Sequence, residues 1–248
     1  MQSRYYDPVT CKFINADDPR IILTDMYNTK SIYIWDYCCG NPVIFIDPTG
    51  YYNVNKAIEY AKKWWNKRNS NYYSYSQDCA NFVSQCLYAG GLSMSGQGRH
   101  NGWHSYKIIL TKLIKMNFFG IIKTIKYKYT KWDVSASWSM VTDLKNWLKT
   151  QKKAMSLSIH SKKDLLRNLE KGFIKTGQVA FLSTRYNGEL THAVLIGKVT
   201  KKNAYYFGHT SNRNGFTQKY GLVEYFDDIP FYRNKPLVVI LKIPSNAR

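Results

Sequence analysis

The sequence predicts an α+β fold in which helices pack on an antiparallel sheet, preceded by a small β-rich segment. Three observations lead to this prediction. Apolar residues recur at helical spacing early in residues 51–248, short apolar runs bounded by turn residues follow Gly177, and the charge changes sharply near Gly50. We therefore divide the chain into two units, residues 1–50 and residues 51–248.

The change in charge marks the boundary between these units. Residues 1–50 hold 4 Lys and Arg against 6 Asp and Glu, a net charge of −2, whereas the remainder holds 32 against 10, a net charge of +22. A net charge this positive favours an anionic partner, such as nucleic acid, acidic lipid, cell-wall polymer or an acidic protein inhibitor. Nucleic acid is the partner we expect least, because the basic residues are spread along the unit and no acidic cluster suggests a metal-dependent nuclease.

Residues 1–50 alternate short β-like runs with Asp-Pro and Gly-Asn-Pro turns. A segment of this length buries little surface alone, so it resembles the end of a larger β-structure. Three motifs, RYYDP, KFINADDP and the closing Pro42-x4-Asp-Pro-Thr-Gly, resemble the Rhs repeat-associated core, which ends the YD-repeat shells that encapsulate toxins.

That resemblance implies an Rhs shell upstream and an aspartyl self-cleavage just after the closing motif. By position, the two aspartates of this reaction are Asp18 and Asp36, one acting as base on water and the other as acid. Tyr51 stands where the family usually has Leu. An isolated Asp-Pro is also a common turn former, so both roles of these aspartates stay open.

The second unit begins with two predicted helices. The first spans residues 54–66, where apolar residues recur on one face between Lys and Glu. The second starts at Cys79, with Asp78 as its N-cap and Gly90-Gly91 as its end. Its buried stripe consists of Phe82, Val83, Cys86 and Leu87.

Cys79 is the candidate nucleophile. In the first turn of a helix, unpaired N–H groups and the positive end of the helix dipole stabilise a thiolate and lower the pKa of the thiol. Cys86 lies one heptad further on the same face and is interpreted as structural. The alternative is that both cysteines are small buried hydrophobic residues.

Four strands are predicted after Gly177, at residues 178–183, 191–199, 204–209 and 236–243, with turns at 186–188 and 201–203. His192 heads one strand and His209 ends the next, so pairing of these strands brings both imidazoles to one edge of the sheet. Together with a helix-borne Cys79, they favour acyl transfer, with His192 as the general base. This chemistry needs no metal and no cofactor.

Residues 51–248 resemble an amidase domain family of the papain-like superfamily, related to the NlpC-type cell-wall peptidases. The resemblance rests on five elements in order: YYNVNKAIEYAKKWW, DCANFVSQCLYAGG, SWSMVTDLKNWL, THAVLIG and GHTSNRN. It implies a papain-like cysteine amidase fold, with Cys79 as nucleophile and His192 as general base. His209 is the match for the third residue, which orients the base, and Asn212 is the alternative.

Residues 105–131 mix Lys with Ile, Leu, Phe and Tyr and contain no acidic residue. We favour a helical layer that packs on the core and exposes its lysines. The alternative is a basic amphipathic segment that contacts an anionic membrane or an acidic partner. A further helix at 161–171, capped by Ser161, carries no chemistry.

Taken together, these patterns favour a cysteine amidase or peptidase that is the effector domain of a secreted polymorphic toxin. We expect a peptide or protein amide as its substrate, with peptidoglycan included, and an acidic immunity protein as its inhibitor. The alternative is a basic toxin domain that acts on membranes or binds nucleic acid, with an inactive amidase fold. We expect delivery into a target cell, with no signal peptide and no transmembrane segment in these residues.

Overall fold

The computed structural model describes residues 6–7, 12–13, 52–118, 121–183, 188–210, 212, 215, 221–228, 236–244 and 247. In the first unit this range holds two short antiparallel strands, β1 (Tyr6–Asp7) and β2 (Lys12–Phe13). Asp18, Asp36 and the closing motif lie outside the described residues, as does most of the predicted turn at 186–188.

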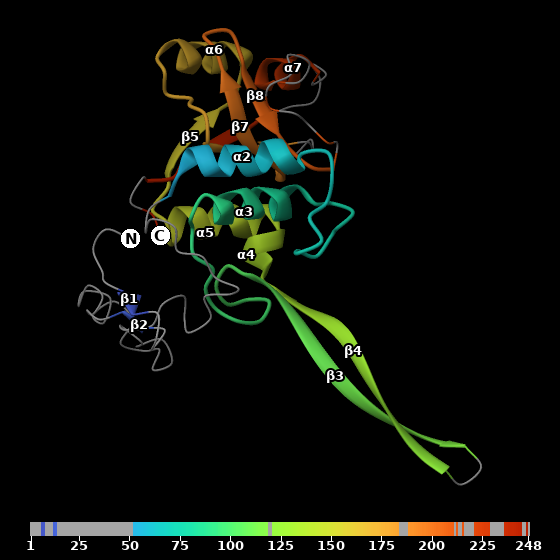
Figure 1. Ribbon diagram of the computed structural model, residues 1–248. Coiled ribbons are helices and arrows are strands. Elements are labelled where there is room, and N and C mark those ends of the chain that lie inside the picture. The colour runs from blue at the N-terminus through green and yellow to red at the C-terminus, as the bar shows by residue number, and fades with distance from the viewer. Residues whose placement is uncertain are drawn as a thin grey trace.

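A five-stranded antiparallel sheet forms the centre of the second unit, in the order β5-β9-β6-β7-β8 (Figure 1). The strands are β5 (Met155–Ile159), β6 (Val179–Ser183), β7 (Leu190–Val199), β8 (Ala204–Phe207) and β9 (Val238–Lys242). The four predicted strands and the α+β class are confirmed, and β5 adds an edge strand that the sequence patterns did not predict.

Helices cover both faces of this sheet (Figure 1). One face packs against α2 (Val54–Trp64), α3 (Cys79–Ala89) and α5 (Val141–Thr150), with the short α4 (Ala136–Ser139) beside them. The other face packs against α6 (Lys162–Glu170) and α7 (Leu222–Asp227). Alternate strand residues therefore enter different cores, which explains why these strands read as continuous apolar runs.

Helix α3 lies at the centre of the first helical layer and is buried on every side over residues 79–87. Its predicted start at Cys79 and end at Gly90 are confirmed. One detail was wrong: the Asp78 side chain makes no capping hydrogen bond, although Asp78 occupies the N-cap position. Its carboxylate has other partners, described below. The helix at 161–171 is confirmed, with Ser161 Oγ accepting a bond from the Asp164 N–H at 3.1 Å.

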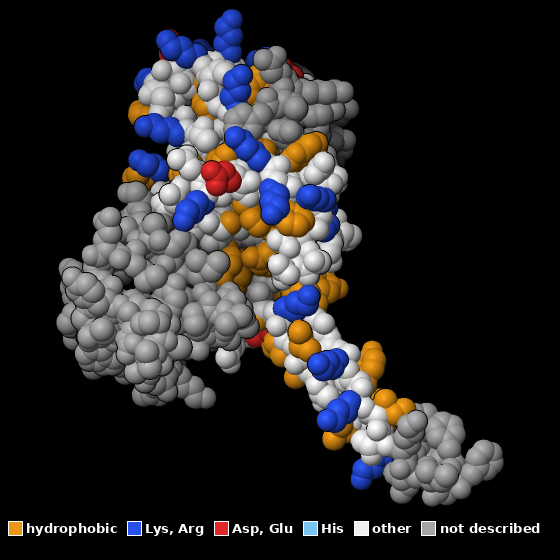
Figure 2. Space-filling view, viewed as in Figure 1, with side chains coloured by type: hydrophobic (Ala, Val, Ile, Leu, Met, Phe, Trp, Pro, Cys, Tyr) orange, Lys and Arg blue, Asp and Glu red, His pale blue; other side chains and the backbone are white. Residues whose placement is uncertain are grey.

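The prediction of a helical layer at 105–131 was wrong. These residues form a β-hairpin of β3 (Ser105–Phe118) and β4 (Ile121–Val134), which pair in register along their whole length. The hairpin projects from the domain, and lysine and apolar side chains both line it (Figures 1 and 2). In β4, Lys and Tyr alternate with a period of two, and β-branched residues are frequent in both strands. Both features favour a β-strand over an α-helix.

The two ends of the second unit meet beside α2. The Tyr52 N–H donates to the Ala247 carbonyl at 3.1 Å, and the Tyr52 hydroxyl donates to the Gly177 carbonyl at 3.3 Å. Gly177 has a φ of +83°, and a Cβ there would overlap the Val54 methyl groups.

None of the helices in the described ranges is both long enough and apolar enough to span a membrane.

Gly177 therefore offers a test of this packing against a matched control. Gly177→Ala should lower the free energy of unfolding by about 2–4 kcal/mol, because it combines a left-handed backbone with the overlap on Val54. Gly172 also has a positive φ, of +69°, but no atom lies within 4 Å of its Cβ position. Gly172→Ala should cost only about 1–2 kcal/mol. Urea unfolding of both variants measures the difference, and equal losses would contradict the packing.

Candidate active site

Cys79 is the first residue of α3 and lies against β7, with 5% of its surface exposed. Burial raises the pKa of the Cys79 thiol, while backbone hydrogen bonds with Ala193, Ala80 and Cys79 itself lower it in part. The net direction is upward, so burial outweighs the helix N-terminus from which the sequence predicted a lowered pKa. The sulfur therefore needs a base to take its proton at neutral pH.

Cys86 lies two turns further along α3 and is fully buried in the core. Burial raises the pKa of the Cys86 thiol well above its ordinary value. A thiol in this environment is inert, in agreement with the structural role predicted for it.

His192 lies in β7, next to the residue whose backbone contacts the Cys79 sulfur. The alternation of β7 is interrupted at this point, because Leu190 and Ala193 both pack into the core on the α3 side. The register shifts opposite, between Leu182 and Ser183 of β6. Such irregularities re-aim a side chain and are frequent beside active sites.

Gly208, directly after β8, leaves room for this imidazole. His192 Nε2 lies 3.6 Å from the point where a Cβ on Gly208 would stand, and Val194 Cγ1 lies 3.2 Å from the same point. A Cβ at position 208 would therefore be in ordinary contact with the His192 ring and in tight contact with the Val194 methyl group. The sequence patterns pointed to the neighbouring His209 and missed this glycine.

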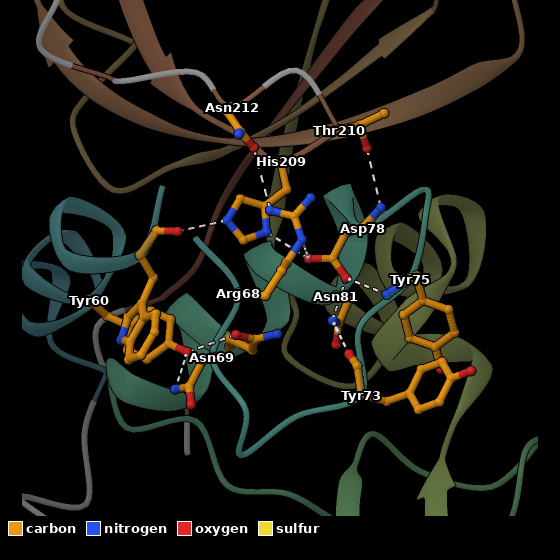
Figure 3. A network of polar contacts seen from close by, with 12 residues as sticks. Tyr60, Arg68, Asn69, Tyr73, Tyr75, Asp78, Asn81, His209, Thr210 and Asn212 are labelled. Carbon is orange, nitrogen blue, oxygen red and sulfur yellow. Dashed lines mark hydrogen bonds and ion pairs between the residues drawn. The ribbon is translucent and has the colours of Figure 1, made fainter. Parts of the chain in front are cut away.

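His209 is held by two acceptors. Its Nδ1 lies 2.6 Å from Asp78 Oδ2, and its Nε2 lies 2.8 Å from the Trp64 carbonyl oxygen (Figure 3). Both partners are hydrogen-bond acceptors, so the ring is held between two oxygen atoms. The Phe82 ring stacks on it with the centroids 3.9 Å apart. Both nitrogens are thus used in contacts with Asp78 and Trp64.

Asn212, the alternative third residue, faces a different side chain. Its Oδ1 accepts from the Arg68 guanidinium at 3.4 Å, and its φ is +43°. Arg68 in turn lies with its Nε 3.2 Å from Asp78 Oδ2 (Figure 3). The structure therefore brings His209 and Asn212 together around Asp78.

Asp78 is completely buried and binds four donors. Oδ2 is in contact with His209 Nδ1 and Arg68 Nε. Oδ1 accepts hydrogen bonds from the Tyr75 N–H at 3.1 Å and from the Asn81 side-chain amide at 2.7 Å. A carboxylate removed from water needs such pairing, because an unpaired buried charge is very costly. This network fixes the residue that immediately precedes Cys79.

Thr210 connects the same network to the turn after β8. Its hydroxyl accepts from the Asp78 N–H at 3.2 Å, and its φ is +77°, a conformation that β-branched residues rarely adopt. Backbone strain of this kind persists only where surrounding contacts impose it, and it clusters at functional sites.

The sequence patterns missed the role of Asp78, Arg68 and Asn81. One signal could have found them: Asp and Asn three residues apart flank Cys79 in an otherwise apolar helix, and a buried polar pair needs partners. Asn81 meets this need by also binding the Tyr73 carbonyl and the Trp138 indole.

Across the described ranges, no three His, Cys, Asp or Glu side chains gather as a metal site requires.

Comparisons with known proteins support an amide-hydrolysing domain. A stretch of 48 residues is 54% identical to part of Uncharacterized protein YhbB of Bacillus subtilis (strain 168), and it covers 19% of this chain and 15% of that protein. The chain thus spans much less than two thirds of that relative. No solved structure matches the chain. A family model described as "Putative amidase domain" matches residues 51–232, which is most of the chain, and the protein therefore belongs to this amidase family.

Proposed function

We propose that residues 51–248 form a cysteine-dependent amide hydrolase in which Cys79 is the nucleophile and His192 the general base. One observation carries the proposal: Cys79, at the start of the buried helix α3, lies where that helix packs against β7, the strand that contains His192. The family match supports the class of reaction, hydrolysis of an amide bond.

The proposed reaction is acyl transfer through a thioester. His192 takes the proton from the Cys79 thiol as the sulfur attacks the amide carbonyl carbon. N–H groups in the first turn of α3, which have no partner within the helix, stabilise the negative oxygen that forms. His192 then gives its proton to the departing amine as the C–N bond breaks. Water, deprotonated by His192, hydrolyses the thioester and releases the acid.

We propose that His209 acts on this site through Asp78. The sequence assigned it to orient the His192 ring, but its nitrogens bind Asp78 and Trp64. In this role His209 is a positioning residue: it binds the buried carboxylate that precedes Cys79 and so fixes the start of α3. Asn212 and Arg68 contribute to the same network from its exposed side.

We propose further that the domain is the effector of an Rhs-type polymorphic toxin, delivered into a target cell. The support is the series of three core motifs in residues 1–50 and the charge change that follows them. The substrate is a peptide or protein amide, and the peptide stems of peptidoglycan are one class of candidate.

The first test is growth of a bacterial host that expresses the full chain, either in the cytoplasm or directed to the periplasm. Wild type should stop growth in one compartment, and Cys79→Ala should restore it, because loss of the nucleophile lowers the rate about a thousandfold or more. Cys86→Ala, from the same helix, should remain toxic. Cys79→Ala killing as well as wild type would rule out cysteine catalysis.

The second test is the pH dependence of alkylation of Cys79 by iodoacetamide, followed by mass spectrometry of the peptide that contains it. Only the thiolate reacts, and burial raises the pKa of this thiol. The rate should therefore be lower than that of free cysteine at neutral pH and should still rise at a pH where free cysteine levels off. A plateau below neutral pH would instead indicate a preformed thiolate.

The third test is a double-mutant cycle on Asp78 and His209. Each alanine substitution should lower the free energy of unfolding by about 3–5 kcal/mol, because it leaves the other charge buried without its partner. The double variant should lose clearly less than the sum of the two. Lys162 and Asp227 form an exposed pair at 2.8 Å, so Lys162→Ala should cost less than about 1 kcal/mol. Additive losses at Asp78 and His209 would show that the two are not coupled.

A further inference from the structure

Strand β3 of the projecting hairpin exposes apolar side chains on both of its faces. Ile109 and Leu113 lie on one face with 66% and 59% of their surface exposed, and Ile108 and Ile114 lie on the other with 37% and 39% exposed. A strand that is apolar on both faces is typical of the interior of a sheet that is covered on both sides. β3 therefore has the side chains of a central strand at a position where it is an edge.

Strand β4 is different. There Lys126 and Lys128 alternate with the exposed Tyr127 and Tyr129. Both strands carry lysines, at Lys107, Lys112 and Lys115 in β3 and at Lys126, Lys128 and Lys131 in β4, so lysine alone does not distinguish their edges. In the described part of the chain β3 pairs with β4 alone, so its outer edge is open to a further strand, and the exposed apolar side chains on both of its faces favour this edge over the outer edge of β4.

The positive charge of the hairpin indicates that its partner is negatively charged. Among its described side chains there are six lysines, and they are distributed along the described part of the arm (Figure 2). Within the described part of the hairpin the acidic residue is Asp133, at the base of the arm. Its Oδ1 lies 3.3 Å from His104 Nε2. An anionic partner is therefore complementary to the arm, and a second copy of the hairpin would bring the same lysines to the interface.

The two-faced pattern distinguishes between anionic partners. A bilayer surface covers one face of a ribbon and would leave either Ile109 and Leu113 or Ile108 and Ile114 in water. A protein that adds a strand to a sheet edge can cover both faces, while its main chain bonds the edge. We propose that the free edge of β3 accepts a strand from an acidic protein, whose carboxylates pair with the hairpin lysines. This inference does not depend on the proposed hydrolase activity.

The probe for this edge is a synthetic peptide of about ten residues in which Glu and Val alternate, added to the full chain. Fluorescence anisotropy measures binding, and amide hydrogen exchange locates it. Protection should appear in β3 and not in β5, which is an edge strand of the main sheet. Raising sodium chloride from about 50 mM to about 500 mM should weaken binding about tenfold, because salt screens the lysines.

Variants on the exposed face separate pairing from general charge attraction. Ile109→Ser combined with Leu113→Ser should weaken peptide binding about tenfold, since it removes the apolar surface that the added strand covers. Thr111→Ser, which lies between them on the same strand, should bind as wild type. The proposal fails if the peptide does not bind, if protection falls on β5, or if phosphatidylglycerol vesicles bind the chain and the peptide does not. Cys79→Ala should bind the peptide unchanged, so loss of catalysis and loss of docking are separable.

Discussion

Asp78 carries a negative charge that is completely removed from water, and the geometry around Cys79 depends on how that charge is neutralised. His209 and the Arg68 guanidinium bind one oxygen, while a backbone N–H and a side-chain amide donate to the other. The donors come from the segment after α2, the loop before α3, α3 itself and the turn after β8. One carboxylate therefore joins four segments, and the residue that follows it in sequence is Cys79, the proposed nucleophile.

Adjacent residues here have opposite electrostatic requirements. Four hydrogen-bond donors surround the Asp78 carboxylate, whereas burial and the nearby Asp78 charge both raise the pKa of the Cys79 thiol. A cysteine in this setting is protected from oxidation and stray alkylation while no substrate is bound, because the thiol is a weak nucleophile. The proposed base removes its proton only when a carbonyl is in position, so reactivity is coupled to substrate binding.

Local patterns predicted α3 and four of the strands, because an N-terminal Asp, a terminal Gly pair and short apolar runs are signals contained within about ten residues. They could not predict that Asp78 binds His209, which is far away in sequence, or that the sheet is covered on both faces. The hairpin was mistaken for a helix because mixed Lys and Ile fit either period when no tertiary contact decides. The roles of Cys79 and His192 were inferred from their positions in the sequence and stay predictions, whereas the contacts of Gly208 and Arg68 emerge only when distant segments are brought together.

The hydrogen bond between Tyr52 and Ala247 means that the chain enters and leaves the second unit at one place. Joining these two positions would close a very short loop, which costs little conformational entropy. The unit is therefore suited to circular permutation. The same geometry would let the unit be inserted into a surface loop of a carrier protein without separating the two ends of that loop.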